Sequence, residues 1–389
     1  MLWLWFCAAC VQCGMLWFLW YSGKKRLTLA ASHGAAQAQH TPLAGLIIPV
    51  AGQHPNMPQA LRSLLMQDYP HCLPVMVTAT AEEPAALLVK QLQQEFPDVR
   101  HVVAGKAEAC GQKNHNTLQA IASLAAEPVD VYVFCDSTHR AKQDFVSSLV
   151  QPIAAGRVNV TTGYHMVVAE DEGIVTRAYQ LCVLLMRLLQ AVAVFTQPWG
   201  GAMAIRRTAF ERLGIGTLWA GNVVDDCSLA ALLLQKKEPV LLCPQALLHT
   251  VASQHRWSVW GAWMDRQILF LKFCVPSQWV LLGVFALMMS LTPLVALYSL
   301  PAALFGAYCP VPWWLGLVYC GLLAAVVARW REFLSEGCRL GPWLAAFAAA
   351  CGMFVFVFAR TAMAQGIVWH GIEYTVGRGG RVCAMRRCH

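Results

Sequence analysis

The chain has 389 residues, of which 57% are hydrophobic and only 13% are charged. An ordinary soluble domain has about 25% charged residues, so the composition argues against a wholly soluble protein. The shortage of charge falls in residues 1–21 and in most of 279–359, whereas 40–250 has the composition of a globular domain. The sequence therefore predicts an integral membrane protein with one soluble domain between hydrophobic ends.

The formal net charge of +8 comes from basic residues beside the hydrophobic segments and in the last dozen residues. Nucleic-acid-binding proteins instead carry their basic residues along one soluble face. Anionic lipid headgroups are the more natural counterpart of this charge. We therefore expect the lipid bilayer as a partner and no nucleic acid.

The 16 cysteines are scattered along the chain, and several lie in apolar runs, where Cys behaves as a small hydrophobe. Cys7, Cys10 and Cys13 have the CxxCxxC spacing of cluster ligands, but they lie in the first apolar stretch without a fourth ligand or a polar shell. Reduced structural cysteines of a protein that faces the cytosol are the better interpretation.

Residues 1–21 hold no charge and are followed by the basic run KKR. The length suits one transmembrane helix, and a secretory signal would carry its basic residues before the apolar core rather than after it. The positive-inside rule then places residue 24 onward in the cytoplasm and the N-terminus outside. We predict a transmembrane helix with a basic stop over 1–26 and a polar linker over 27–43.

Residues 44–252 alternate between strand-like and helix-like stretches, as expected of a cytoplasmic α/β domain. Such alternation predicts a mixed, mostly parallel sheet with helices on both faces. Neither a GxxxxGK[ST] loop nor a GxGxxG loop occurs in the chain, so P-loop and dinucleotide chemistry are not supported. The predicted strands cover residues 46–52, 73–77, 101–103, 131–135 and 157–164, and residues 199–207 predict a tight turn into a further strand. The predicted helices cover 57–66, 115–124, 177–195 and 225–234.

The strand-like run VYVFC (131–135) leads directly into Asp136 and then into small polar and basic residues. Open α/β sheets bind ligands beyond the carboxyl ends of their strands, and Mg²⁺ or Mn²⁺ prefers oxygen ligands. Asp136 is therefore a candidate ligand for a divalent cation that holds a diphosphate. The alternative is that its carboxylate only caps the helix that follows.

Two further clusters lie in the second half of the domain. The pair Gly200-Gly201 predicts either a close approach of the backbone to a ligand or a plain turn before a strand. Asp225 and Asp226 open a helix, where both carboxylates favour the positive helix N-terminus. One of them can instead be a general base at the mouth of a pocket, and the presence of Asp136 upstream favours this second interpretation.

Residues 253–277 place tryptophans and aliphatic residues at helical spacing among charged ones. This pattern predicts an amphipathic helix in the membrane interface; a core-packed helix is the alternative. Residues 278–366 predict about three transmembrane helices, the first two separated near 309–312. Strict counting then places the basic tail, 367–389, outside, against the positive-inside rule; a re-entrant or interfacial last segment would remove the conflict.

Short motifs occur along the chain in a recognisable order. They are Ile48-Pro49 with Gly52, Gln67-Asp68-Tyr69-Pro70, Gly111-Gln112-Lys113-x-His115-Asn116, Asp136-Ser137, Thr162-Gly163-Tyr164, Trp199-Gly200-Gly201, Asp225-Asp226, Arg256-Trp257, Arg266-Gln267 and Trp369-His370-Gly371-Ile372-x-Tyr374. On these motifs, residues 45–280 resemble the GT-A domain of the inverting glycosyltransferases of family 2. The resemblance is closest to the ceramide-glucosyltransferase-like branch, family 21, which includes hopanoid-type lipid glycosyltransferases; the flanking spans have the same plan.

The resemblance implies transfer of a sugar from a nucleotide diphosphate donor, usually a UDP-sugar, to a lipid hydroxyl with inversion at the anomeric carbon. Asp226 matches the family's base, with Asp225 beside it, and Asp136 matches the ligand of a divalent cation, Mg²⁺ or Mn²⁺, that neutralises the leaving diphosphate. A membrane lipid acceptor would account for an interfacial helix. The implied donor-binding residues are Pro49, Glu83, Lys113, Asp136, Gly200, Gly201, Arg256 and Trp257.

The sequence departs from the family pattern in three places. Thr80 stands where the family has an aspartate beside the uridine, with Glu83 shortly after it. The metal motif begins with Asp136 but reads DST, so the second carboxylate of a DxD motif is missing. The (Q/R)xxRW motif that ends in Arg256 and Trp257 begins with Ser253.

The function implied is a ceramide-like lipid glycosyltransferase of the bacterial inner membrane or an equivalent membrane, with its catalytic domain in the cytoplasm. A hopanoid or another lipid is the alternative acceptor. From a different class, the chain could be a catalytically inactive nucleotide- or lipid-binding membrane protein. A processive polysaccharide synthase is disfavoured because those enzymes usually keep the full QxxRW motif and a longer membrane channel.

Overall fold

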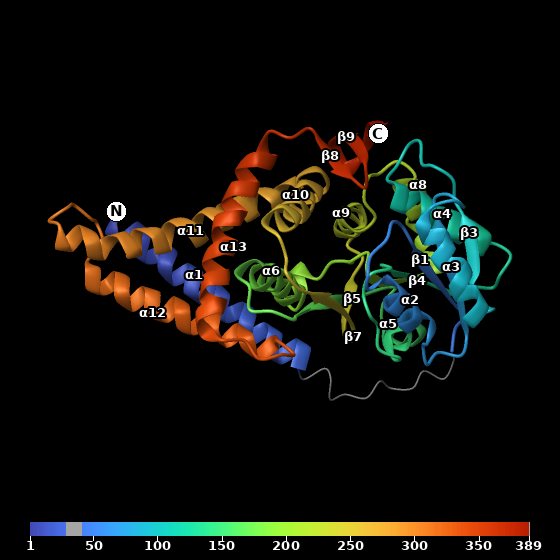
Figure 1. Ribbon diagram of the computed structural model, residues 1–389, viewed down its shortest axis with the longest axis horizontal. Helices are drawn as coiled ribbons and strands as arrows, with labels where there is room; N and C mark the ends of the chain where they lie inside the picture. The colour runs from blue at the N-terminus through green and yellow to red at the C-terminus, as the bar shows by residue number, and fades with distance from the viewer. Residues whose placement is uncertain (29–40, 389) are drawn as a thin grey trace.

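A computed structural model describes residues 1–28 and 41–388, so most of the linker predicted over 27–43 lies outside the described residues. An α/β domain occupies one end of the molecule, and a group of long helices extends from it (Figure 1). Short single-turn elements, η1 (Lys24–Thr28), η3 (Ala193–Phe195), η4 (Trp330–Phe333) and η5 (Arg378–Gly380), connect the longer ones.

The domain is built on a seven-stranded sheet in the order β3-β2-β1-β4-β6-β5-β7. The strands are β1 (Ala44–Pro49), β2 (Cys72–Thr78), β3 (Arg100–Val103), β4 (Val131–Cys135), β5 (Val160–Ala169), β6 (Ala202–Arg206) and β7 (Val240–Ala252). Only β6 is antiparallel to its neighbours, β4 and β5, and the other pairs are parallel. This confirms the predicted mixed, mostly parallel sheet; β7 is a strand that the sequence patterns did not reveal.

Helices cover both faces of the sheet because successive strand residues point to opposite sides. On β1, Leu46 and Ile48 belong to the core under α2 and α5, whereas Ile47 belongs to the core under α4 and α8. The helices of the domain are α2 (Met57–Leu65), α3 (Pro84–Glu95), α4 (Gln112–Ser123), α5 (Phe145–Ala154), α6 (Ile174–Gln190), α7 (Arg207–Arg212), α8 (Ile215–Trp219) and α9 (Asp226–Lys236).

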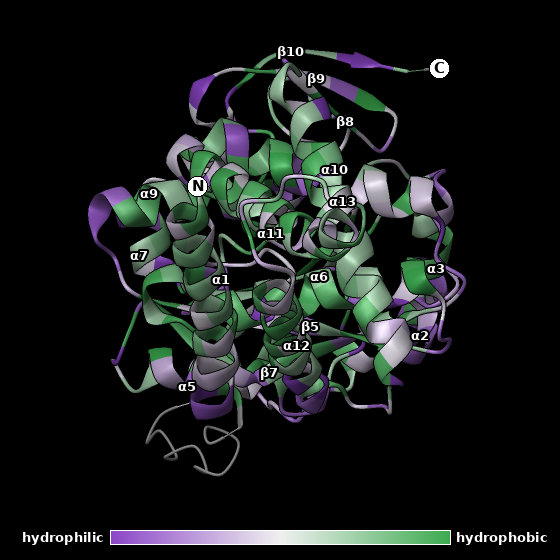
Figure 2. Ribbon diagram, turned by 90° about the vertical axis from the view of Figure 1, so that its left-hand side faces the viewer, coloured by the Kyte–Doolittle hydropathy of each residue, from purple (hydrophilic) through white to green (hydrophobic). Residues whose placement is uncertain are grey.

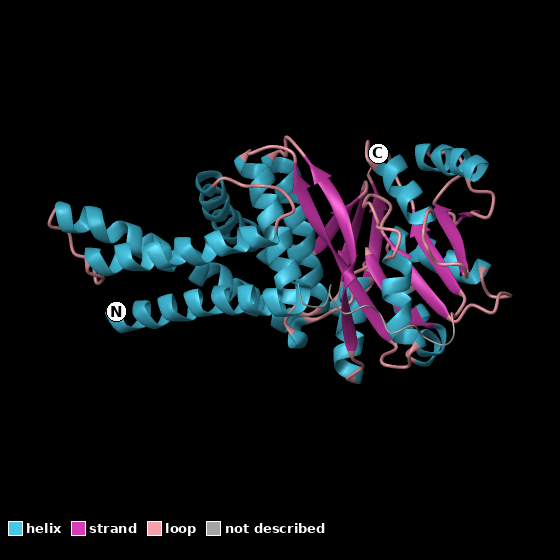
Figure 3. Cartoon of the chain, turned by 90° about the horizontal axis from the view of Figure 1, so that it is seen from below, coloured by secondary structure: helices cyan, strands magenta, loops and turns pink. Residues whose placement is uncertain are grey.

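Four helices among the described residues are long and apolar enough to cross a membrane. They are α1 (Leu2–Gly23), α11 (Pro276–Leu304), α12 (Trp313–Arg329) and α13 (Leu340–Ala362). Viewed along the bundle, α11, α12 and α13 are predominantly hydrophobic (Figure 2). Figures 1 and 3 show α1, α11 and α12 extending away from the sheet, whereas α13 runs across the base of these three helices.

Helix α10 (Trp257–Cys274) lies between the α/β domain and the bundle (Figure 1). Its residues Trp260, Met264 and Ile268 are buried, while Trp257 and Val259 are about half exposed, at 52% and 54%. The helix predicted to be amphipathic is therefore partly packed into the core and partly open to its surroundings.

Residues near the C-terminus form a second, antiparallel sheet of β8 (Gly366–Trp369), β9 (Ile372–Val376) and β10 (Val382–Arg387). This C-terminal sheet attaches to the loop that precedes α9. The amide of Val223 donates to the carbonyl of Gly380 at 3.0 Å, and the amide of Val382 donates to the carbonyl of Gly221 at 2.9 Å. The segment expected as a basic tail is thus folded against the α/β domain.

Candidate active site

Three aspartates and one lysine from three separate parts of the domain meet at one edge of the sheet. Asp136 directly follows β4, Asp225 and Asp226 begin α9, and Lys113 lies in the first turn of α4. We call these residues the aspartate–lysine cluster. All of them were predicted to belong to the site.

Lys113 lies at the centre of this cluster. Its Nζ atom is 2.8 Å from Oδ1 of Asp136 and 2.9 Å from Oδ2 of Asp225, and it donates a 3.3 Å hydrogen bond to the carbonyl of Gly200. Burial acts to lower the pKa of Lys113, but the negative charges of Asp136, Asp225 and Asp226 outweigh it, and the pKa is raised. The lysine is therefore a fixed cation.

The two adjacent aspartates of α9 differ in access to solvent. The side chain of Asp225 is only 4% exposed and is committed to Lys113, while the indole Nε1 of Trp219 donates to its backbone carbonyl at 3.0 Å. Asp226 is partly exposed. Its Oδ2 accepts from the amide of Gly200 at 3.1 Å and its Oδ1 from the amide of Cys227 at 2.7 Å. Only Asp226 is thus placed to meet an incoming substrate.

The electrostatics separate the roles of the aspartates further. Burial, reinforced by the charge of Asp225, raises the pKa of Asp226 to about 6, close to the value that suits a general base at neutral pH. Burial also acts to raise the pKa of Asp136, but the charge of Lys113, with a smaller contribution from His139, lowers it below the usual range. Asp136 therefore stays ionised while Asp226 can gain and lose a proton.

The glycine pair lies where no side chain fits. A Cβ atom on Gly200 would lie 2.4 Å from Oδ2 of Asp225, and one on Gly201 would lie 2.4 Å from the ring of Trp199. The turn is held in place because the amide of Trp199 donates to Oγ1 of Thr162 at 3.1 Å. The backbone of this turn therefore lies close to the carboxylates of the cluster, and the approach of a ligand to it stays a prediction.

A histidine pair lies behind Asp136. Oγ1 of Thr250 is 2.7 Å from Nδ1 of His139 and 2.8 Å from Nδ1 of His165, and the ring of His165 stacks on Trp199 with centroids 4.7 Å apart. Burial lowers the pKa of both histidines. Nε2 of His139 is 3.9 Å from Oδ2 of Asp136, so this buried network lies directly beside the aspartate. The sequence reasoning missed both histidines.

The remaining predicted donor-side residues occupy more peripheral positions. Pro49 ends β1 beside Val77 of β2. Glu83 precedes α3, where its Oε1 accepts from the amides of Ala79 and Thr80 at 2.5 and 3.1 Å. At least one oxygen of Glu83 is therefore used to shape the loop after β2.

Arg256 and Trp257 are exposed at the start of α10. Among the residues that the structure describes, no hydrogen bond or ion pair joins Arg256 to the aspartate–lysine cluster. Arg266, one of the motif residues on the same helix, is instead half-buried. Burial raises the pKa of Tyr179, and the charge of Arg266 acts to lower it. Burial, reinforced by the charge of Asp226, raises the pKa of Tyr164.

Gln67 of one family motif and Asn114, the neighbour of Lys113 in another, act in folding rather than in chemistry. The side-chain amide of Gln67 donates to the carbonyl of Lys142 at 2.9 Å and its oxygen accepts from the amide of Val146 at 3.0 Å, which ties α2 to the start of α5. Asn114 donates to the carbonyls of Trp219 and Asn222 at 3.3 and 2.9 Å. These bonds fix α4, and with it Lys113, against α9.

The donor set of the cluster fits a divalent cation. Oxygens of Asp136 and Asp225, from different elements, converge on one positively charged atom, and Mg²⁺ at nucleotide sites commonly uses one or two carboxylates together with substrate phosphates and water. Within residues 1–28 and 41–388, no group of three or more His, Cys, Asp or Glu side chains could hold a metal ion. Water or the phosphates of a bound donor would therefore complete the coordination.

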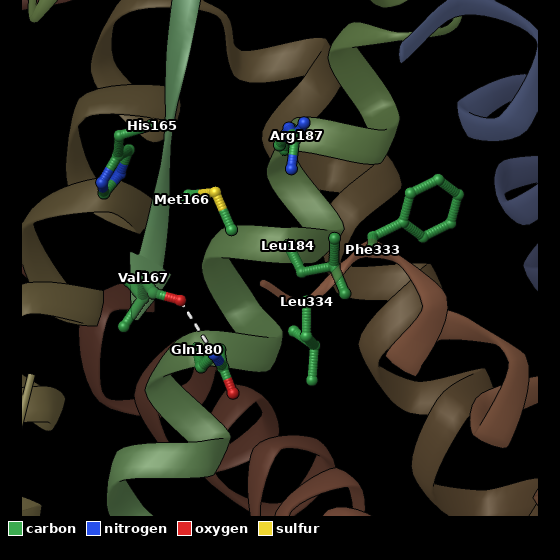
Figure 4. Close-up of a pocket in the computed structure, with 8 residues that line it drawn as sticks. All are labelled: His165, Met166, Val167, Gln180, Leu184, Arg187, Phe333 and Leu334. Atoms are coloured by element: carbon green, nitrogen blue, oxygen red, sulfur yellow. Dashed lines mark hydrogen bonds between the residues drawn. The ribbon is translucent and has the colours of Figure 1, made fainter. Parts of the chain in front are cut away.

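Two cavities lie away from this cluster. One, of about 10 Å³, lies between β5, α6 and the turn after α12, and Figure 4 shows Arg187 of α6 at its edge. The other, of about 30 Å³, is wholly apolar and lies between α1, α6, α11 and α13. Since no residue of the cluster lines either cavity, both belong to the junction between the domain and the bundle.

The mixed, mostly parallel seven-stranded sheet and the four long apolar helices among the described residues confirm the predicted α/β fold class. A profile described as Glycosyl transferase family 21 matches residues 3–382. The chain belongs to this family. No curated protein sequence matches it.

Similar solved structures share little sequence with the chain. The mannosyltransferase PcManGT from Pyrobaculum calidifontis, in complex with GDP-Man and Mn²⁺, is 14% identical over 92% of this chain and 98% of its own, with a TM-score of 0.49. GalNAc-T7 with UDP, GalNAc and Mn²⁺ is 13% identical over 61% and 50%, with a TM-score of 0.40. A mycobacterial protein is 16% identical over 63% and 77%, with a TM-score of 0.37. The family assignment therefore rests on the profile match.

Proposed function

We propose that this protein is a membrane-bound inverting glycosyltransferase that moves a sugar from a UDP-sugar to the hydroxyl of a ceramide-like membrane lipid. The observation that carries the proposal is the partly exposed carboxylate of Asp226, held by the amide of Gly200 beside the ion pairs of Lys113. A base and a phosphate-neutralising cation are the two groups that inverting transfer requires next to each other.

Asp226 takes the proton of the acceptor hydroxyl as the acceptor oxygen attacks the anomeric carbon. The new carbon–oxygen bond forms on the face of the sugar opposite the diphosphate. The bond between the anomeric carbon and the diphosphate breaks, and UDP leaves with its electron pair. The amides of Gly200 and Cys227 hold the carboxylate so that its orientation is fixed before the substrate arrives.

Lys113, Asp136 and Asp225 form the donor side of the site. Lys113 supplies a positive charge for the diphosphate, and in the donor-free protein Asp225 holds Lys113 from the buried side. A divalent cation, Mg²⁺ or Mn²⁺, would be held by Asp136 and Asp225 and would supply further neutralisation of the leaving diphosphate. Pro49, Glu83, Gly200, Gly201, Arg256 and Trp257 are proposed as further donor-binding residues.

A lipid acceptor is supported by the position of the site above the membrane-facing elements. The ring of Tyr179 packs edge-on against that of Trp263 of α10, with centroids 5.1 Å apart, and Trp257 at the start of α10 is about half exposed at 52%. A lipid that stays in the bilayer could thus present its headgroup to Asp226 along this helix. A hopanoid-type acceptor would use the same path and is the second candidate.

We further infer that α13 lies in the plane of the membrane surface, so that both of its ends face the catalytic domain. Before the helix, Oε1 of Glu336 accepts from Arg177 of α6 at 3.0 Å. At its end, Lys272 of α10 donates to the carbonyl of Ala362 at 2.6 Å, and the C-terminal sheet bonds to Gly221 and Val223. This arrangement supports three membrane crossings and a C-terminus in the cytoplasm, in keeping with the positive-inside rule.

The proposed function is tested by incubating the purified full-length protein with a panel of UDP-sugars and lipid extracts and by identifying products by mass spectrometry. A glycosylated lipid with an inverted anomeric centre is the expected result. Binding of UDP without any product from ceramide, hopanoid or bulk lipid would favour the inactive binding protein instead.

A further inference from the structure

We propose that Lys113 is a built-in counter-ion that holds the metal position of the donor-free enzyme and leaves it when a divalent cation binds. The inference rests on one part of the proposed function, namely that Asp136 and Asp225 hold the metal that binds the diphosphate of a nucleotide donor. This role explains why Lys113, which could bind a phosphate, forms ion pairs with two carboxylates in the donor-free protein.

The geometry places the ammonium where a metal would be held. Nζ of Lys113 is 2.8 Å from Asp136, 2.9 Å from Asp225 and 3.3 Å from the carbonyl oxygen of Gly200. Three oxygens from three separate elements thus surround one cation. Because Mg²⁺–oxygen distances are about 2.0–2.1 Å, the carboxylates would need to move inward by less than about 1 Å to bind a metal in place of the ammonium.

The same pair of oxygens cannot serve both cations at once. An ammonium and a divalent ion less than 3 Å apart would repel each other strongly. Lys113 has a flexible side chain that carries three donors, so it can leave Asp136 and Asp225 without any movement of α4. A phosphate oxygen of the donor is the natural new partner for the freed ammonium.

The charge balance of the cluster supports this exchange. The carboxylates of Asp136 and Asp225 contact the ammonium of Lys113, and the charge of Asp226 also acts on it. When all three carboxylates are ionised, the cluster carries three negative charges and one positive. Lys113 neutralises only one of the three negative charges, and a divalent cation in its place would neutralise two. Metal binding to the donor-free protein is therefore expected to be weakened by competition with Lys113.

The test measures binding of Mn²⁺ alone, without nucleotide, to the full-length protein by electron paramagnetic resonance of the free ion. Lys113→Met should bind Mn²⁺ more tightly than the parent by about tenfold or more, because the competing cation is gone. Lys90→Met, on the exposed face of α3, is the matched control and should bind like the parent. Equal or weaker binding by Lys113→Met, or no Mn²⁺ binding by any of the three, would overturn the proposal.

A second measurement uses only the parent protein, in case Lys113→Met does not fold. Acylation of lysines is followed by mass spectrometry with and without saturating Mn²⁺. Labelling of Lys113 should rise several-fold when Mn²⁺ is added, while labelling of Lys90 should not change. Unchanged labelling of Lys113 at saturating Mn²⁺ would show that the lysine does not leave, and it would do so whether or not the protein transfers sugar.

Discussion

The backbone amide of Gly200 donates a 3.1 Å hydrogen bond to Oδ2 of Asp226. Through this bond the turn before β6 determines where the proposed base points. The carbonyl of the same residue accepts from Lys113 at 3.3 Å, so one peptide unit connects the base to the donor side of the site. The position of Gly200 is therefore expected to affect catalysis without any side chain of its own.

Gly200→Ala is expected to lower kcat by about 100-fold or more, because its Cβ would lie 2.4 Å from Oδ2 of Asp225 and misplacements of about 1 Å have effects of this size. Gly221→Ala is the control, since a Cβ there meets no atom within 4 Å. Both variants are measured by steady-state kinetics. Parent-level kcat in Gly200→Ala would contradict the role of Gly200 in positioning Asp226.

Asp226→Asn is expected to reduce kcat by about 10²- to 10⁴-fold, the range for loss of a general base. UDP binding, measured by calorimetry, should stay nearly unchanged because Lys113 and Asp136 remain. Asp98→Asn, an exposed substitution outside the site, should behave like the parent in both assays. Parent-level transfer by Asp226→Asn would show that another group removes the proton.

The activity is expected to fall with acidification through about pH 6. Burial and the charge of Asp225 raise the pKa of Asp226 to about 6, and a base works only when it is deprotonated, so the active form is lost as the pH falls below that value. Asp225→Asn should move the acid limb of its residual activity to lower pH, because a charge that raises this pKa is removed. A limb that stays in place, or moves to higher pH, would speak against Asp226 as the titrating base.

Asp136→Ala is expected to weaken metal-dependent UDP binding, since it removes one of the two carboxylates that converge on the cation position. Calorimetric titration with UDP, in the presence and absence of Mn²⁺, measures the effect. The Mn²⁺-dependent part of the affinity should be lost in Asp136→Ala and kept in Asp98→Asn. Unchanged metal-dependent binding would remove Asp136 from the metal site.

The C-terminus is expected on the same side of the membrane as the catalytic domain. Its sheet is bonded to Gly221 and Val223, and Arg360 near the end of α13 pairs with Asp265 of α10 at 2.5 Å. A protease-cleavable tag placed after residue 389 should be cut in sealed inside-out vesicles and protected in right-side-out ones. A tag at the N-terminus should show the reverse, and identical protection of both tags would contradict three crossings.

Local sequence was sufficient for most of the elements. The predicted strand at 131–135 and helix at 57–66 agree closely with β4 and α2, because strand-prone runs and amphipathic periodicity are short-range signals. In contrast, β7 (Val240–Ala252) was missed: only part of it is buried, and it contains a proline that weakens a strand pattern.

The apolar lengths by themselves determined that four helices are long enough to cross a membrane, and a run of strand-prone residues determined that Asp136 stands at the end of a strand. Only the tertiary structure decided that Asp225 is buried against Lys113 while Asp226 remains accessible, and that α13 lies across the bundle. The physical reason is that periodicity and length depend on neighbouring residues. The meeting of Lys113, Asp136 and Asp225 instead depends on the packing of α4, β4 and α9, which no local pattern encodes.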